Sequence, residues 1–118
     1  MGSIKSFKEL EIWKKGIELV KEIYALTENF PSAEVYGLTS QMRRCSISIP
    51  SNVAEGFKKR HAKEFKQFLN IALGSLAELE TQIIIAEELH YSFNGKEALI
   101  SELIDHLNRM IVSLSKKL

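Results

Sequence analysis

Apolar side chains recur at every third or fourth position through four long stretches of this chain, which is the spacing of one face of an α-helix. The four stripes are Leu10, Trp13, Ile17, Val20 and Tyr24; Val35, Leu38, Met42, Cys45 and Ile49, resuming after Pro50 at Val53 and Phe57; Phe65, Phe68 or Leu69, Ala72, Leu76, Leu79, Ile83 and Ala86; and Ile100, Leu103, Leu107, Met110 or Ile111, and Leu114. Because only short connections separate the stripes, successive helices are expected to run antiparallel. The sequence therefore predicts an all-α fold, an antiparallel up-down-up-down four-helix bundle.

Helix signals and helix breakers refine this prediction at three places. Ser6 and Glu9 have the spacing of a capping box, which predicts that the first helix starts there. Pro50 lies inside the second helix and removes one backbone hydrogen bond, so we expect a kink or a short break at this residue. Gly74 lowers the helix propensity of the third stripe by about 1 kcal/mol. A cost of this size suggests that a neighbouring element packs closely against Gly74.

The apolar stripes are wider than the interior of a lone bundle requires. Further apolar residues lie beside them at Ile12, Ile23, Ile71, Leu73, Ile84, Ile85, Ile104 and Val112. A second apolar face on several helices is typical of a surface that contacts another subunit. Since homo-oligomers are common among soluble proteins, this pattern predicts self-association.

Length and composition favour a single domain in a reducing compartment. The chain has 118 residues, of which 45% are hydrophobic and 26% charged, and we assign residues 6–118 to one domain. Residues 1–5, which begin Met-Gly-Ser, are interpreted as a tag remnant and disordered start. The lone cysteine, Cys45, excludes an intrachain disulfide, and no apolar run approaches the roughly 18 residues of a membrane span. We therefore expect a cytoplasmic protein with no membrane partner.

Charge is unevenly distributed along the chain, although the net charge is only +1. Residues 41–66 contain seven basic residues and two acidic ones, whereas residues 78–105 contain seven acidic residues and one lysine.

Clustered lysines and arginines bind nucleic-acid phosphates by releasing counterions. We predict a nucleic-acid-binding surface formed by Arg43, Arg44, Lys58, Lys59, Arg60, Lys63 and Lys66. The alternative is an ordinary solvated turn. Phe57 and Phe65 are assigned to the core, so base stacking is not indicated and binding is expected to involve the phosphate backbone.

No group of residues has the composition and spacing of a catalytic or metal site, so no enzymatic activity, metal or cofactor is predicted. Cys45 lies on an apolar stripe and is interpreted as a buried structural residue. The stretch from Pro50 to Gly56 is the most unusual one in the chain. Asn52 and Glu55 either recognise a ligand or bind to backbone groups freed by Pro50 and to the third helix, and we favour the second interpretation.

Several segments together resemble a known family. They are Phe30-Pro31, Glu34, Tyr36-Gly37-Leu38, Gln41-Met42-Arg43-Arg44, Ser48-Ile49-Pro50-Ser51-Asn52-Val53-Ala54-Glu55-Gly56, Phe68-Leu69, Ala72-Leu73-Gly74-Ser75-Leu76 and Glu78-Leu79-Glu80. The chain resembles the bacterial four-helix bundle proteins encoded in intervening sequences of 23S rRNA genes, and it is similar to the accessory variability determinant of diversity-generating retroelements.

The resemblance implies a homopentamer, RNA or DNA binding and, for the retroelement relatives, a reverse transcriptase partner. It also implies that the shared motif residues carry architecture rather than chemistry; these are Pro50, Ser51, Asn52, Glu55, Gly56, Gly74 and Ser75.

The charge distribution and the apolar surfaces are compatible with two functions. The leading hypothesis is a non-enzymatic oligomeric bundle that binds RNA through the basic residues at the turn between the second and third helices. The other is a protein-interaction scaffold with no nucleic-acid role, in which the basic region of one subunit meets the acidic region of another.

Overall fold

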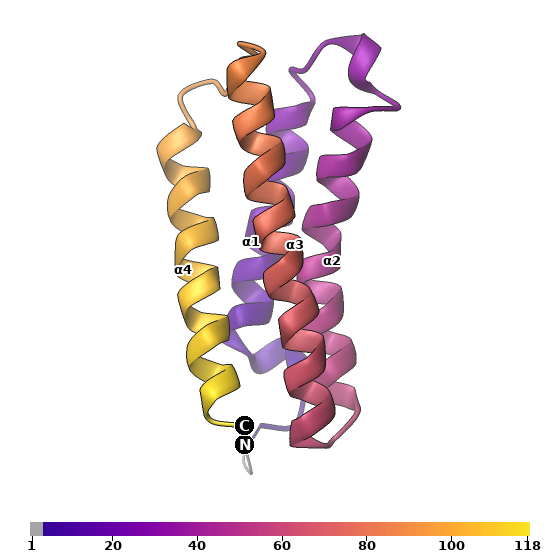
Figure 1. The fold of residues 1–118 in the computed structure, drawn as a ribbon, viewed down its shortest axis with the longest axis vertical. Helices are drawn as coiled ribbons and strands as arrows, with labels where there is room; N and C mark the ends of the chain where they lie inside the picture. Colours follow the sequence, from indigo (N-terminus) through magenta and orange to yellow (C-terminus); the bar gives the residue numbers. More distant parts are fainter. Residues whose placement is uncertain (1–3) are drawn as a thin grey trace.

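The computed structural model describes residues 4–118, and these residues form four α-helices and two short 3-10 helices. The elements are η1 (Phe7–Glu9), α1 (Glu11–Thr27), η2 (Ser32–Glu34), α2 (Leu38–Lys58), α3 (Ala62–Glu88) and α4 (Glu97–Lys116). The α-helices lie side by side, and their connections lie at alternate ends of a molecule 46 Å long (Figure 1). The predicted all-α four-helix fold is confirmed.

One hydrophobic core runs through the bundle, and each α-helix contributes a face to it. The largest fully buried side chains are Leu19 and Ile23 of α1, Met42, Ile49 and Val53 of α2, Phe65, Leu69, Leu76 and Leu79 of α3, and Ile100, Leu107 and Ile111 of α4. Burying a side chain of this size contributes about 1.5–3 kcal/mol. The most extensive interface joins α2 to α3. The stripes predicted for α2, α3 and α4 supply these core residues, except that Val35 precedes α2 and is exposed.

Within α1 the predicted stripe is wrong by one residue, although its first member, Leu10, lies just before the helix and is buried as predicted. The buried positions of α1 include Ile12, Leu19 and Ile23, whereas Ile17 and Tyr24 are exposed. Two stripes one residue apart both fit the helical period. The packing of α1 against α2 selects the stripe that contains Gly16. A Cβ atom at Gly16 would lie only 3.1 Å from the Cβ of Pro50. Gly16 thus lets α2 pack directly against the backbone of α1, and this contact turns the face containing Gly16 inward.

Part of the wide apolar surface therefore belongs to the core. Ile12, Ile23 and Ile104, which the sequence assigned to subunit contacts, are each no more than 5% exposed. By contrast, Ile71 and Ile84 on α3 are both 52% exposed. The apolar surface that remains for subunit contacts is narrower than predicted, and much of it lies on α3.

The capping box at Ser6 and Glu9 is present, but it caps η1 and does not start α1. The carboxylate of Glu9 accepts hydrogen bonds from the backbone N–H groups of Lys5 and Ser6. Helix α1 begins at Glu11, after the extended residue Leu10. Residues 1–3 of the predicted tag remnant lie outside the described residues, whereas Ile4 packs against the core.

Pro50 lies within α2, which continues as one helix from Leu38 to Lys58. The alternative of two separate short helices is therefore wrong, and a bend at Pro50 stays a prediction. Asn52 donates from Nδ2 to the backbone oxygen of Ser48 at 2.7 Å and to the Ser48 hydroxyl at 3.0 Å, and this hydroxyl lies 2.7 Å from that of Ser75. These bonds form a polar chain that joins α2 to α3. Glu55 and Ser51 are exposed on the same helix.

The expected close neighbour of Gly74 is absent from the described residues, because no atom beyond the adjoining residues and the local backbone of α3 lies within 4 Å of a Cβ placed there. The tight contact between α2 and α3 occurs instead at Gly56, where an added Cβ would lie 2.7 Å from the Cβ of Phe68. Gly56 is close to the turn between these helices and lets them approach each other before the chain reverses direction.

Among the described helices, α3 alone is long and apolar enough to cross a membrane by length and composition. A core helix of a water-soluble bundle also meets this criterion, and α3 contributes Leu69, Leu76 and Leu79 to the core.

Candidate nucleic-acid interface

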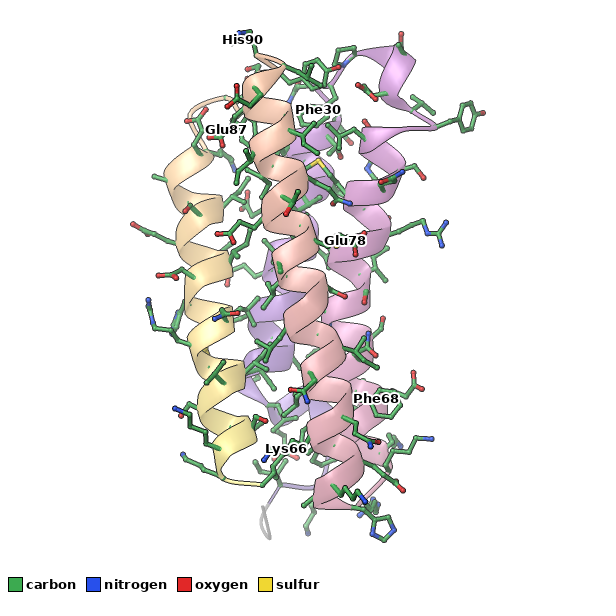
Figure 2. All side chains as sticks on the ribbon, in the orientation of Figure 1. Phe30, Lys66, Phe68, Glu78, Glu87 and His90 are labelled. Carbon is green, nitrogen blue, oxygen red and sulfur yellow. The ribbon has the colours of Figure 1, made fainter. Side chains whose placement is uncertain are left out.

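The turn between α2 and α3 brings five of the predicted basic residues to one end of the bundle. Lys58, Lys59, Arg60, Lys63 and Lys66 are all exposed. Lys58 and Lys59 end α2, and Lys63 and Lys66 lie in the first turns of α3. In Figure 2, Lys66 and Phe68 lie toward this end, and Glu87 and His90 lie at the other.

The two ends of the described chain, at Ile4 and Leu118, lie at the same end as this turn (Figure 1). The segments at these ends add four exposed lysines that the predicted surface does not contain. We name the whole group the basic end: Lys5, Lys8, Lys58, Lys59, Arg60, Lys63, Lys66, Lys116 and Lys117. The local sequence around Lys116 and Lys117 marks only the last turn of α4 and does not predict that they lie beside the α2–α3 turn. Their position follows from the topology, because an even number of antiparallel helices returns the chain to the end at which it started.

Arg43 and Arg44 do not belong to the basic end. Arg43 donates from Nε to the hydroxyl of Thr27 at 2.8 Å, and its guanidinium carbon lies 4.5 Å from the centre of the Tyr24 ring. This arginine therefore holds α1 against α2. Arg44 is exposed but lies 14 positions before Lys58 on α2, which is about 21 Å along a helix. The seven predicted residues form two separate groups rather than one surface.

The opposite end of the molecule is acidic. The exposed or half-buried carboxylates there are Glu28, Glu34, Glu87, Glu88 and Glu97. The two ends are separated by most of the 46 Å length, whereas the Debye length at physiological salt is about 8 Å. The acidic end therefore does not screen the positive potential of the basic end.

The basic end keeps its charge available for a partner. The ion pairs among the described residues involve Lys14, Lys15, Lys96 and Arg109, none of which belongs to the basic end. Glu9 and Glu64 are acidic residues near this end, but the Glu9 carboxylate is bound to backbone N–H groups. Lys59 lies with its Nζ 5.7 Å from the centre of the Phe68 ring. An exposed cation–π contact of this kind contributes about 0.5–1 kcal/mol and leaves the charge in place.

A hollow of about 400 Å³ opens at the basic end. Its lining is mainly apolar and includes Phe57, Phe65 and Leu118, together with Arg60 and His61. The Phe57 and Phe65 rings are in edge-to-face contact, with their centres 6.1 Å apart. Arg60 has a φ of +62°, so its backbone is in the left-handed region that glycine adopts most easily.

A second, polar groove of about 480 Å³ follows the seam between α2 and α3. Arg44, Cys45 and Glu78 are among its lining residues. The Cys45 thiol donates to the backbone oxygen of Ser75 at 3.0 Å. Burial, reinforced by the nearby Glu78 carboxylate, raises the pKa of Cys45 to about 12. The thiol is therefore protonated near neutral pH and is a poor nucleophile.

The part of the chain that the structure describes contains no cluster of three or more His, Cys, Asp or Glu side chains arranged to hold a metal ion.

At the acidic end, Tyr91 donates its hydroxyl proton to Glu34 at 2.5 Å, and Glu34 also accepts from the N–H of Leu38. These hydrogen bonds lower the pKa of Glu34, and the carboxylate raises the pKa of Tyr91. The pair ties the α1–α2 connection to the α3–α4 connection and is structural.

The fold and the charge distribution define a small helical-bundle protein with a basic end and an acidic end. The sequence model of one family, described as 23S rRNA-intervening sequence protein, matches residues 8–113. The chain belongs to this family, as the resemblance predicted. The family description names neither a reaction nor a ligand. No curated protein is similar enough to the chain to be counted as a relative.

Proposed function

We propose that this protein is a non-enzymatic, cytoplasmic, oligomeric bundle that binds structured RNA through the basic end. The observation that carries the proposal is the convergence of nine exposed basic side chains, from three separate parts of the chain, on one end of the molecule. Ion pairs within the described chain do not neutralise them. Contacts of lysine and arginine with phosphates supply affinity without reading sequence.

The test is a salt titration of binding to a labelled RNA hairpin, followed by fluorescence anisotropy. We expect the affinity of the wild-type protein to fall steeply between about 50 and 200 mM salt. The variant Lys58→Ala/Lys59→Ala/Arg60→Ala should bind at least about tenfold more weakly and show a shallower salt dependence, because each lost phosphate contact reduces the slope by about one.

The matched control removes the same number of positive charges elsewhere. Lys21→Ala/Lys96→Ala/Arg109→Ala has the same net charge as the test variant, but its substitutions lie outside the basic end. We expect this variant to bind RNA much as the wild type does. No binding at low salt, or equal losses in both variants, would contradict the proposal.

The oligomer is proposed from the exposed apolar side chains of α3 and from the resemblance, which implies a pentamer. Ile71, Ile84 and Ile85 are 44–52% exposed and would be removed from water between subunits. Light scattering coupled to size exclusion should give the mass of five chains, and a monomer at micromolar concentration would contradict this part of the proposal. A reverse transcriptase partner stays a prediction of the resemblance.

The separation of charge also favours a second function, a scaffold in which the basic end of one subunit contacts the acidic end of the next. Such contacts weaken as salt screens them. If the mass in solution falls as salt is raised, and RNA does not bind at any salt concentration, the scaffold function is supported over RNA binding.

A further inference from the structure

We propose that the hollow at the basic end holds the base of an unpaired nucleotide, so that the protein prefers RNA with an unpaired end over a blunt duplex. This inference rests on the proposed RNA binding and names the class of RNA. It also revises the expectation from the sequence that base stacking plays no part.

The first support is the shape and lining of the hollow. Its volume of about 400 Å³ falls within the range of about 300–1,000 Å³ that is usual for small-molecule sites. Phe57 and Phe65 lie in it, and each is at most 9% exposed, so the hollow offers an apolar floor at the surface of the core. Ile4 and Leu118 from the two chain ends complete its apolar walls.

The second support is the pair of planar, nitrogen-containing side chains in the lining. Guanidinium and imidazole planes stack on unpaired bases, and Arg60 and His61 supply one of each. Arg60 also has a left-handed backbone, which costs a residue with a Cβ more than it costs glycine. This conformation ends α2, in the same way that His90, with a φ of +61°, ends α3. An arginine at this position keeps a cation beside an apolar hollow.

The third support is the chemistry that such a site selects. A matching occupant has an apolar part to contact the lining of the hollow and negative charge to meet the surrounding lysines. A nucleotide has both properties, because its base is uncharged and its phosphate is an anion. Lys58, Lys59 and Lys63 are the nearest basic residues in the sequence and are free to bind the flanking phosphates.

One competing occupant exists on the protein itself. Leu89 is 50% exposed and follows Glu87 and Glu88 at the acidic end, so it is an apolar side chain with acidic neighbours. A second copy of the chain placed head to tail would present this leucine to the hollow. The observations favour the nucleotide, because Arg60 and His61 offer stacking planes that a leucine does not need. The experiment distinguishes the two occupants.

The experiment compares one RNA hairpin with a blunt end and the same hairpin with a short 3′ overhang, both measured by anisotropy at fixed salt. The wild-type protein should bind the overhang about tenfold more tightly, in the range expected for one stacked base. Ala62→Trp should abolish this preference, because Ala62 lines the hollow and the indole would fill it. Its salt dependence should remain, since all nine basic residues are retained.

Ala98→Trp is the matched control, because Ala98 is likewise exposed near the start of a helix, α4, but lies at the acidic end. It should keep the overhang preference. If the wild type binds both RNAs equally, or if Ala62→Trp keeps the preference, the inference is overturned while RNA binding stands. If no RNA binds, both fail. If Ala62→Trp lowers the mass of the protein in solution and leaves RNA selectivity unchanged, the hollow holds a second copy and the nucleotide proposal is wrong.

Discussion

Gly56 and Gly74 both lie inside long helices, yet their surroundings are opposite. At Gly56 an added Cβ would lie 2.7 Å from the Cβ of Phe68 and 3.0 Å from the Phe65 ring, whereas at Gly74 it would enter open space. The first glycine is required by packing between α2 and α3. The second lowers helix propensity with no gain from packing within the described chain.

The substitutions Gly56→Ala and Gly74→Ala should therefore have opposite effects on stability. We expect Gly56→Ala to lower the free energy of unfolding by about 1–3 kcal/mol through overpacking, and Gly74→Ala to raise it by up to about 1 kcal/mol. Chemical denaturation with circular dichroism measures both. A gain in stability for Gly56→Ala would show that the two helices separate easily at the turn.

At the scale of the helices, the polar chain from Asn52 through Ser48 to Ser75 fixes how α2 meets α3. The Ser48 and Ser75 hydroxyls are 2.7 Å apart within this interface. A double-mutant cycle with Ser48→Ala and Ser75→Ala should give a coupling energy of about 0.5–1.5 kcal/mol, the usual net contribution of a hydrogen bond. The same cycle between Ser48 and the exposed Ser113 of α4 should give none, and equal values in the two cycles would argue against the bond.

The two connections at the acidic end are held together by a bond that depends on pH. Because the folded protein lowers the pKa of Glu34 below its ordinary value of 4.5, this group contributes stability above pH 4.5 and loses it as pH falls through the lowered pKa. Tyr91→Phe removes the donor and should lower the melting temperature at neutral pH. The difference from wild type should shrink as the pH is lowered below 4.5. Tyr36→Phe, at a residue that is 97% exposed, is the control and should have no effect at either pH.

Helix periodicity predicted the core faces of α2, α3 and α4, because in these helices the stripe of large apolar residues is also the face that packs. It predicted the wrong face of α1, where Ile17 and Tyr24 fit the period but Gly16 contacts Pro50. The deciding interaction is the approach of the Pro50 ring to the backbone at Gly16, 34 positions away in the chain, and a local pattern contains no information about it. The capping box was recognised correctly, but the sequence did not show that it belongs to a separate short helix.

For the whole molecule, the sequence located the basic segment but not the full basic end. Lys58 to Lys66 form a local run that is visible in the sequence, whereas Lys5, Lys8, Lys116 and Lys117 join them only through the topology. Arg43 was included because of its charge, yet its guanidinium is bound to Thr27 and stacked on Tyr24. Charge is read directly from sequence, but whether a charge is available depends on contacts between helices.

Because the described chain begins, and α4 ends, at the basic end, the order of the helices can be rearranged by circular permutation. Helices α1 and α4 already contact each other, so a short linker between the ends would permit a circular permutant with the order α4, α1, α2, α3. New ends opened in the connection between Glu88 and Glu97 would lie at the acidic end. Tolerance of such permutation is common when termini are close. In the permutant, a fluorescent label or affinity tag would sit at the end of the molecule opposite the nine basic residues, which would leave them free to bind.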